Sequence, residues 1–244
     1  MNLKYCFKDN EDINKILAID YKIGIIIKRF VVCDKNGYIG IYDMTRNKVN
    51  FIELKFSFIK KCHDSYINCI LYMNDKNLLV SGSNGDKSLR LWEIKQNSIK
   101  YIDSVNTFST LYNDSLLYMN ENLLVGENKG IKVFEIVNKK LKCKYYFENE
   151  EFGGVFSMKD LGNNYFICGR SYGFCSVFLL RENSIRKVNI FRNNNLSYIG
   201  NYDYNYDNFY ITNICVDYNN GLILISSADK TIKIYDFEIL NINN

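Results

Sequence analysis

The stretch HDSYINCILYMNDKNLLVSGSNGDKSLRLWEI, residues 63–94, carries the strongest pattern in the sequence. Two apolar runs, 66–73 and 78–80, are followed by small residues, and the run 89–94 then alternates apolar and polar side chains. A period of two is that of a β-strand. Asn84-Gly85-Asp86 lies between two of these runs, and Asn and Gly accept positive φ at little cost, which favours a hairpin turn. The stretch therefore predicts antiparallel strands.

The same pattern returns four times along the chain. Residues 30–44, 123–136, 165–180 and 222–237 each read as an apolar strand, a polar turn with Gly or Asp, and an alternating strand that ends in an aromatic residue. The aromatic residues are Tyr42, Trp92, Phe134, Phe178 and Tyr235, separated by 50, 42, 44 and 57 residues. A period of about 40 to 45 residues indicates a repeat architecture, with insertions at the two longer spacings.

Residues 63–94 resemble a WD40 repeat. They carry His63, then Ser81-Gly82-Ser83, then Asp86, and end in Trp92-Glu93 where the family most often has Trp-Asp. The resemblance covers most of the chain, most strongly at 63–94 and 208–239. It implies an all-β fold, a WD40-like β-propeller.

The resemblance implies about five four-stranded blades in a single domain, 1–244. The repeats are expected near 14–56, 63–103, 107–147, 153–191 and 208–239, with 192–207 as an inserted loop. In the first repeat, strands are expected at 14–20, 29–33, 38–43 and 48–56. Residues 2–8 alternate and are expected to close the last blade. WD40 rings more often have seven blades, so three readings stay open: a small closed ring, a gap filled by another protein, or further blades encoded by the gene.

The composition is that of a globular intracellular protein. With 47% hydrophobic and 15% aromatic residues, the chain has enough apolar surface to pack neighbouring sheets. The net charge of +4 is mild, and the absence of proline leaves turns to Asn and Gly. No apolar run approaches the ~20 residues that span a bilayer, and the N-terminus lacks the apolar core of a signal peptide. We expect a cytoplasmic or nuclear location.

Eight cysteines and one histidine do not form a metal-ligand pattern. No two cysteines have Cys-x-x-Cys spacing, and most of them lie in apolar runs, where a free thiol acts as a small hydrophobic group. A reducing compartment is consistent with free thiols. The sequence also lacks the glycine patterns that bind phosphates. We therefore predict no metal and no cofactor.

His63, Ser81, Asp86 and Trp92 allow two interpretations. Ser, His and Asp can form a catalytic set, but a nucleophile needs an accessible hydroxyl, and Ser81 does not lie in a Gly-x-Ser-x-Gly motif. The resemblance instead implies the WD40 structural tetrad, a buried hydrogen-bonded relay that specifies geometry. We predict no catalytic residue and no enzymatic activity.

The resemblance implies a non-enzymatic scaffold for protein–protein interaction, a WD40 subunit of a larger intracellular complex. The alternatives are a propeller that binds phosphoinositides or RNA through its basic clusters, and an open propeller completed by a partner protein. The Tyr-rich segment 192–208 is either a binding loop or a low-complexity expansion. By analogy with family members, the candidate partner-binding residues are Tyr21, Lys61, Asp64, Asn84, Asp207, Asn208 and Lys230.

Overall fold

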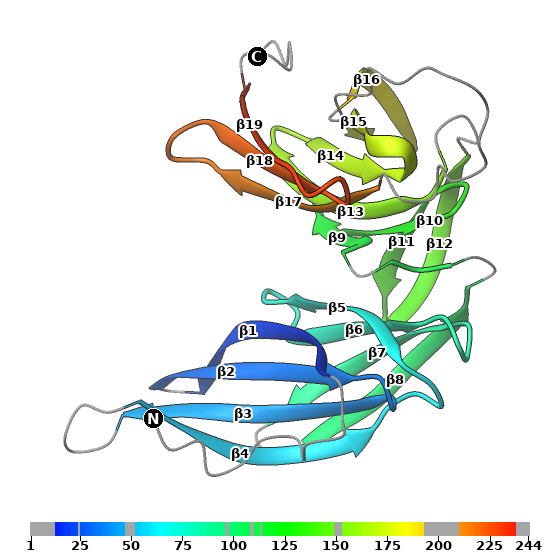
Figure 1. Cartoon of the computed structure of the whole chain (residues 1–244). Helices are drawn as coiled ribbons and strands as arrows, with labels where there is room; N and C mark the ends of the chain where they lie inside the picture. The colour runs from blue at the N-terminus through cyan, green and yellow to red at the C-terminus, as the bar shows by residue number, and fades with distance from the viewer. Residues whose placement is uncertain are drawn as a thin grey trace. The chain divides into compact units, whose positions relative to one another are not determined.

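The structure is a computed structural model that describes residues 13–23, 25–46, 52–95, 98–107, 110–112, 114–148, 153–192 and 210–237. Within these ranges, five antiparallel sheets follow one another along the chain (Figure 1). In each sheet, strands that are neighbours in sequence are also neighbours in space. This meander is the topology of a propeller blade. The prediction of an all-β propeller fold with five repeats is confirmed.

Two sheets come from the first part of the chain. The first contains β1 (Ile13–Ile23), β2 (Ile25–Asp34), β3 (Tyr38–Arg46) and β4 (Ile52–Lys61). The second contains β5 (Ile67–Met73), β6 (Leu78–Ser83), β7 (Ser88–Lys95) and β8 (Ser98–Asn106). With residues 138–141, these two sheets form one compact unit.

Three sheets form the second compact unit. The third sheet contains β9 (Leu116–Met119), β10 (Asn122–Glu127), β11 (Gly130–Val137) and β12 (Lys140–Glu148). The fourth contains β13 (Val155–Gly162), β14 (Tyr165–Arg170), β15 (Phe174–Arg181) and β16 (Ser184–Arg192). The fifth contains β17 (Ile211–Asp217), β18 (Leu222–Ser227) and β19 (Ile232–Asp236), so it has three strands in the described part of the chain.

The core of the first unit lies between its two sheets. Alternate side chains of β2 and β3 point to one face, and they pack against alternate side chains of the second sheet. The fully buried members of this cluster include Val31, Cys33, Ile39, Ile41, Ile67, Leu79, Trp92 and Ile94. Burying one such side chain stabilises the fold by about 1.5–3 kcal/mol. The apolar side chains that alternate in the sequence are therefore the ones that pack the two sheets together.

Two further clusters hold the second unit together. One joins the third and fourth sheets through Leu124, Val133, Phe166 and Phe178, and the other joins the fourth and fifth sheets. Glycine permits the close approach in both cases. A Cβ at Gly126 would lie 2.5 Å from Val155 Cγ1, and a Cβ at Gly169 would lie 2.3 Å from Ile211 Cγ2. A side chain at either position would force neighbouring sheets apart.

Asparagine takes over the tight turns, as the absence of proline predicts. The turns at Asn120-Glu121, Asn138-Lys139 and Asn163-Asn164 each place two successive residues at positive φ, between 48° and 69°. Two successive positive φ values define the type I′ hairpin turn, which matches the twist of the strands that it connects. Asparagine tolerates this conformation better than other residues with a side chain.

One predicted strand lies at different residues. The outer strand of the first sheet was expected at 48–56, and the structure places β4 at Ile52–Lys61. The pairing runs from Arg46↔Ile52 to Tyr38↔Lys61, with an irregularity between Ile41 and Tyr42. Because β3 continues to Arg46, its partner begins later, and the bulge lets β4 extend to Lys61. Hairpin length and bulges leave only weak local signals in a sequence.

Three expectations concern residues or arrangements that the structure does not describe. The strand at 2–8 that would close the last blade lies outside the described residues, as does the inserted loop at 192–207 except for Arg192, which ends β16. The single-domain arrangement of the five sheets stays a prediction.

Candidate functional site

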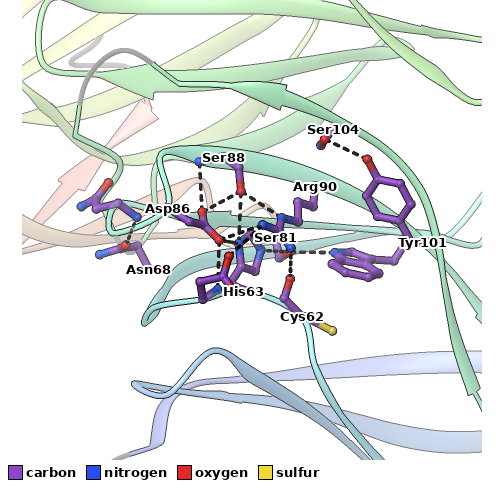
Figure 2. A network of polar contacts seen from close by, with 12 residues as sticks. Cys62, His63, Asn68, Ser81, Asp86, Ser88, Arg90, Tyr101 and Ser104 are labelled. Carbon is purple, nitrogen blue, oxygen red and sulfur yellow. Dashed lines mark hydrogen bonds and ion pairs between the residues drawn. The ribbon is translucent and has the colours of Figure 1, made fainter.

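His63 is the centre of a buried polar network in the second sheet (Figure 2). It lies in the loop between β4 and β5, and it meets Ser81 from β6 and Asp86 from the β6–β7 turn. His63 Nδ1 is 2.9 Å from Asp86 Oδ2, and His63 Nε2 is 2.6 Å from Ser81 Oγ. Trp92 of β7 donates its indole N–H to the same Ser81 Oγ at 2.7 Å. Residues far apart in the sequence are thus joined in one relay.

The partners of Ser81 and Asp86 fix the direction of each hydrogen bond. An ionised Asp86 can only accept, so the proton of a neutral His63 ring lies on Nδ1, which donates to this carboxylate. His63 Nε2 then accepts the hydroxyl proton of Ser81, whose Oγ accepts the indole N–H of Trp92. Every polar atom of the four-residue relay then has a partner.

Two residues that the sequence analysis did not select enlarge the network. Ser88 donates to Asp86 Oδ1 through its hydroxyl at 2.6 Å and through its backbone N–H at 3.2 Å. Arg90 donates to Asp86 Oδ2 at 3.0 Å, to Ser88 Oγ at 3.0 Å and to the Cys62 carbonyl at 2.7 Å. The strand period was the available signal, because residues 88, 90 and 92 lie on one face of β7.

The surroundings hold the pair in its neutral-His, ionised-Asp form. Burial lowers the pKa of His63 and outweighs the Asp86 carboxylate, which favours the protonated ring; Arg90 lowers it further. Burial raises the pKa of Asp86, but the hydrogen bond from Ser88 and the interactions with His63 outweigh it, so the pKa of Asp86 lies below its ordinary value. A carboxylate that accepts several hydrogen bonds is stabilised in its charged form.

The geometry gives this network no access to a substrate. Ser81 is fully buried and His63 is 1% exposed, so the Ser81 hydroxyl faces the inside of the sheet. A nucleophile must reach its substrate. Among the described residues, no group of three or more His, Cys, Asp or Glu could hold a metal ion. The hydrogen bonds of this network hold the β4–β5 loop against the β6–β7 turn.

The cysteines of the described ranges are free thiols. Burial raises the pKa of Cys62 to about 12, and it also raises the pKa of Cys168 and Cys175. A thiol with a raised pKa carries little thiolate and is a poor nucleophile. These buried cysteines act as small apolar side chains, as predicted, whereas Cys143 and Cys215 are exposed.

The other sheets lack histidine and join the same parts of the blade by other means. In the fourth sheet, Arg170 donates to the Gly153 carbonyl at 2.9 Å, and Ser171 Oγ accepts the Gly154 N–H at 3.1 Å. In the fifth sheet, Ser227 Oγ donates to the Tyr210 carbonyl at 3.4 Å. Each bond connects the segment before the first strand to the region between the second and third strands.

The third sheet has its own version, and the fifth sheet has a turn carboxylate. Tyr112 donates its hydroxyl to Asn128 Oδ1 at 2.6 Å, which links the segment before β9 to the β10–β11 turn. In the β18–β19 turn, Asp229 accepts bonds from the N–H and hydroxyl of Thr231 at 3.0 and 2.6 Å. Only the second sheet, within the described residues, uses the full His, Ser, Asp and Trp relay.

Three of the candidate partner-binding residues surround the network. Lys61 is exposed at the end of β4, Asp64 is exposed in the loop that carries His63, and Asn84 lies in the β6–β7 turn. The backbone N–H of Asp64 donates to Asp86 Oδ2 at 3.2 Å, and that of Asn84 donates to Asn68 Oδ1 at 2.8 Å. We call Lys61, Asp64 and Asn84 the loop surface.

The remaining candidates lie elsewhere. Tyr21 pairs with Ile27 beside the β1–β2 hairpin, whereas Lys61 pairs with Tyr38 at the opposite end of that sheet. Since β1 continues to Ile23, Tyr21 lies within the strand, and its role as a partner contact stays a prediction. Lys230 is exposed in the β18–β19 turn of the second unit. Asp207 and Asn208 lie outside the described residues.

Replacing His63 with alanine is expected to lower the free energy of unfolding by about 1 to 3 kcal/mol, because Ser81 and Asp86 would each lose a buried partner. Urea unfolding followed by the fluorescence of the single tryptophan measures this change. Ser104→Ala is the control, since Ser104 is exposed and bonded to exposed Tyr101. An unchanged stability in the His63 variant would contradict the structural role.

The stability of the wild-type protein is expected to fall as the pH drops below about 6.5, the ordinary pKa of histidine. The pKa of His63 is lowered in the folded state, so the unfolded chain binds a proton first and is favoured. Urea unfolding between pH 7.5 and 5, above the range in which carboxylates titrate, measures the slope. His63→Gln should remove it, and an equal slope in both proteins would contradict this prediction.

Comparison with known families agrees with the blade geometry. The family model for the WD domain, G-beta repeat, matches residues 54–93 and 200–236. The first match runs from β4 to the end of the His63 network, and the second includes the fifth sheet. No curated protein matches the sequence. No helix in the described part of the chain is long and apolar enough to cross a membrane. The two repeat matches and the five sheets, each with the topology of a propeller blade, make this chain similar to WD40-repeat β-propeller proteins.

Proposed function

We propose that this protein is a non-enzymatic scaffold that binds other proteins, as a subunit of a larger intracellular complex in the cytoplasm or nucleus. WD40 domains generally mediate protein–protein interaction and are typically non-catalytic. The observation that carries the proposal is the loop surface, where the exposed side chains of Lys61 and Asp64 and the half-buried side chain of Asn84 lie beside the His63 network.

The loop surface has the properties of a rigid binding site. The Asp64 side chain is 87% exposed, while its backbone N–H is held by the largely buried Asp86 carboxylate. Tyr66, in the same loop, is 41% exposed. Exposed polar and aromatic groups on fixed backbone lose little conformational entropy when a partner binds. Preorganised loops on a rigid scaffold are common interaction sites.

The basic clusters give less support to a binder of phosphoinositides or RNA. In the cluster formed by Lys139, Lys140, Lys142 and Lys144, Lys139 pairs with Glu93 at 2.6 Å. Paired cations contribute less to the attraction of phosphates. Tyr21, Lys230, Asp207 and Asn208 remain candidate contacts of the scaffold.

The test is recovery of partners by the tagged full chain expressed in its own cells. Asp64→Lys should reduce the recovery of specific partners by about 10-fold or more, because a reversed charge opposes a complementary surface. Asp75→Lys is the matched control, since Asp75 is exposed in the β5–β6 turn at the other end of the same sheet. Equal recovery by wild type and Asp64→Lys, with thermal stability unchanged, would contradict the loop surface as a binding site.

A further inference from the structure

Arg90 joins β7 and the turn before it to the His63 loop, whose Cys62 lies 28 residues earlier in the sequence. Its Nη1 donates to the Cys62 carbonyl at 2.7 Å, its Nη2 donates to Asp86 Oδ2 at 3.0 Å, and its Nε donates to Ser88 Oγ at 3.0 Å. These acceptors belong to the His63 loop, to the β6–β7 turn and to β7 itself. A guanidinium presents its donors in a fixed planar fork, so it can bond several acceptors at once.

The His63 loop is held on its other side by the first sheet. The backbone N–H groups of Cys62 and His63 both donate to the Gly37 carbonyl, at 2.8 and 3.0 Å. Gly37 has φ +85°, and a Cβ there would lie 2.2 Å from the His63 carbonyl oxygen. The loop is therefore fixed between a glycine turn of the first sheet and the guanidinium of Arg90.

Asp64 lies at the outer end of this arrangement. Its carboxylate Oδ2 is 3.9 Å from Arg90 Nη2, and its backbone N–H donates to the Asp86 carboxylate that Arg90 also binds. The Arg90 side chain is 26% exposed, against 87% for that of Asp64. The partly buried guanidinium of Arg90 thus lies next to the exposed Asp64 carboxylate, and Arg90 and the Asp64 backbone are both bonded to Asp86.

We infer that Arg90 is a positioning residue for the loop surface: it locks the loop 62–66 onto the turn 84–87 and so fixes where Asp64 meets a partner. This inference rests on the proposed function. Arg90 acts through Asp64 and Asp86, while the contact with the partner is made by the exposed side chains.

The charge of Arg90 also bears on His63. The charged groups near the ring are Asp86 from the turn, Asp64 from the same loop and Arg90 from β7. Arg90 lowers the pKa of His63, whereas both carboxylates raise it. Loss of the guanidinium should therefore raise the pKa at which His63 titrates, an effect that a purely packing role would not produce.

The experiment uses the purified full chain and needs no partner. Hydrogen exchange reports the protection of the Asp64 amide, and the Cε1–H resonance of the single histidine reports the titration of His63. Arg90→Met should speed the exchange of amides in 62–66 and 84–88 by about 10-fold or more, because bonds to charged groups are lost. It should also raise the pKa of His63. Arg186→Met, at an exposed site on β16, is the control and should change neither.

Arg90→Lys separates geometry from charge. An ammonium keeps the positive charge but lacks the planar fork. The pKa of His63 should therefore stay near its wild-type value, while amide exchange in the loop should be as fast as in Arg90→Met. Faster exchange spread evenly over all sheets, or unchanged exchange at 62–66 in Arg90→Met, would overturn the inference. Asp64→Asn keeps the amide bond to Asp86, so it should leave loop exchange unchanged. In the separate recovery of partners from cells, normal binding by Asp64→Asn would contradict the loop surface as the proposed binding site, while the role of Arg90 in ordering the loop would stand.

Discussion

Replacing Trp92 with alanine is expected to lower the free energy of unfolding by about 3 to 5 kcal/mol, the range for large buried aromatic residues. Trp92 is 2% exposed and belongs to the cluster between the first two sheets. Its ring packs edge-on against Tyr101 at 5.6 Å, with Lys60 Nζ 5.7 Å from the ring centroid. Its removal opens a cavity and takes the indole N–H from Ser81.

Urea unfolding followed by far-UV circular dichroism measures this loss, since the variant lacks the only tryptophan. Trp92→Phe is the matched control. It keeps most of the apolar ring but removes the N–H donor, so it should lose about 1 to 3 kcal/mol. A loss below about 1 kcal/mol in the alanine variant would show that the second sheet does not depend on this side chain.

Replacing Arg29 with methionine is expected to cost about 3 to 5 kcal/mol, because a buried ion pair would lose one partner. Arg29 is 1% exposed and lies directly opposite Asp43 in the β2–β3 pairing. Its Nε is 2.5 Å from Asp43 Oδ1, and its Nη1 donates to the Lys95 carbonyl at 3.2 Å. Ser57 donates to the other oxygen of Asp43. Without Arg29, the Asp43 side chain, 18% exposed, keeps a charge that lacks its cation.

The double variant Arg29→Met with Asp43→Asn distinguishes a lost ion pair from lost packing. It should recover a large part of the stability, because the uncompensated carboxylate is gone. Arg181→Met, at an exposed position, should change the stability by no more than about 0.5 kcal/mol. Equal losses in the single and double variants, measured by urea unfolding, would mean that packing of the Arg29 side chain dominates.

Local pattern was sufficient for most strands. The alternation around Leu89, Leu91 and Trp92 predicts β7, and the asparagine-rich turns predict the hairpins, since both depend on neighbouring residues alone. The position of β4 was missed because β3 continues to Arg46, beyond its predicted end at 43, so its partner begins later; the bulge beside Tyr42 adds one residue.

The sequence likewise indicated some residues of the candidate site and missed others. The order of His63, Ser81, Asp86 and Trp92 marks four residues that the structure joins by hydrogen bonds. Their structural role stays a prediction for the His63 variants to test. Arg90 was missed because its main acceptors include the carbonyl of Cys62, 28 residues away, and a backbone carbonyl has no signature in a sequence.

By itself, the sequence determined the repeat and the strands and turns within it, because these follow from side-chain period and backbone preference over short distances. The residues of the relay were implied by the resemblance to a WD40 repeat. The tertiary structure decided which end of a sheet each candidate occupies, separating Tyr21 from Lys61, and which cation meets which carboxylate, as with Arg29 and Asp43. Such contacts depend on strand register, and a shift of one residue turns every side chain of a strand to the other face.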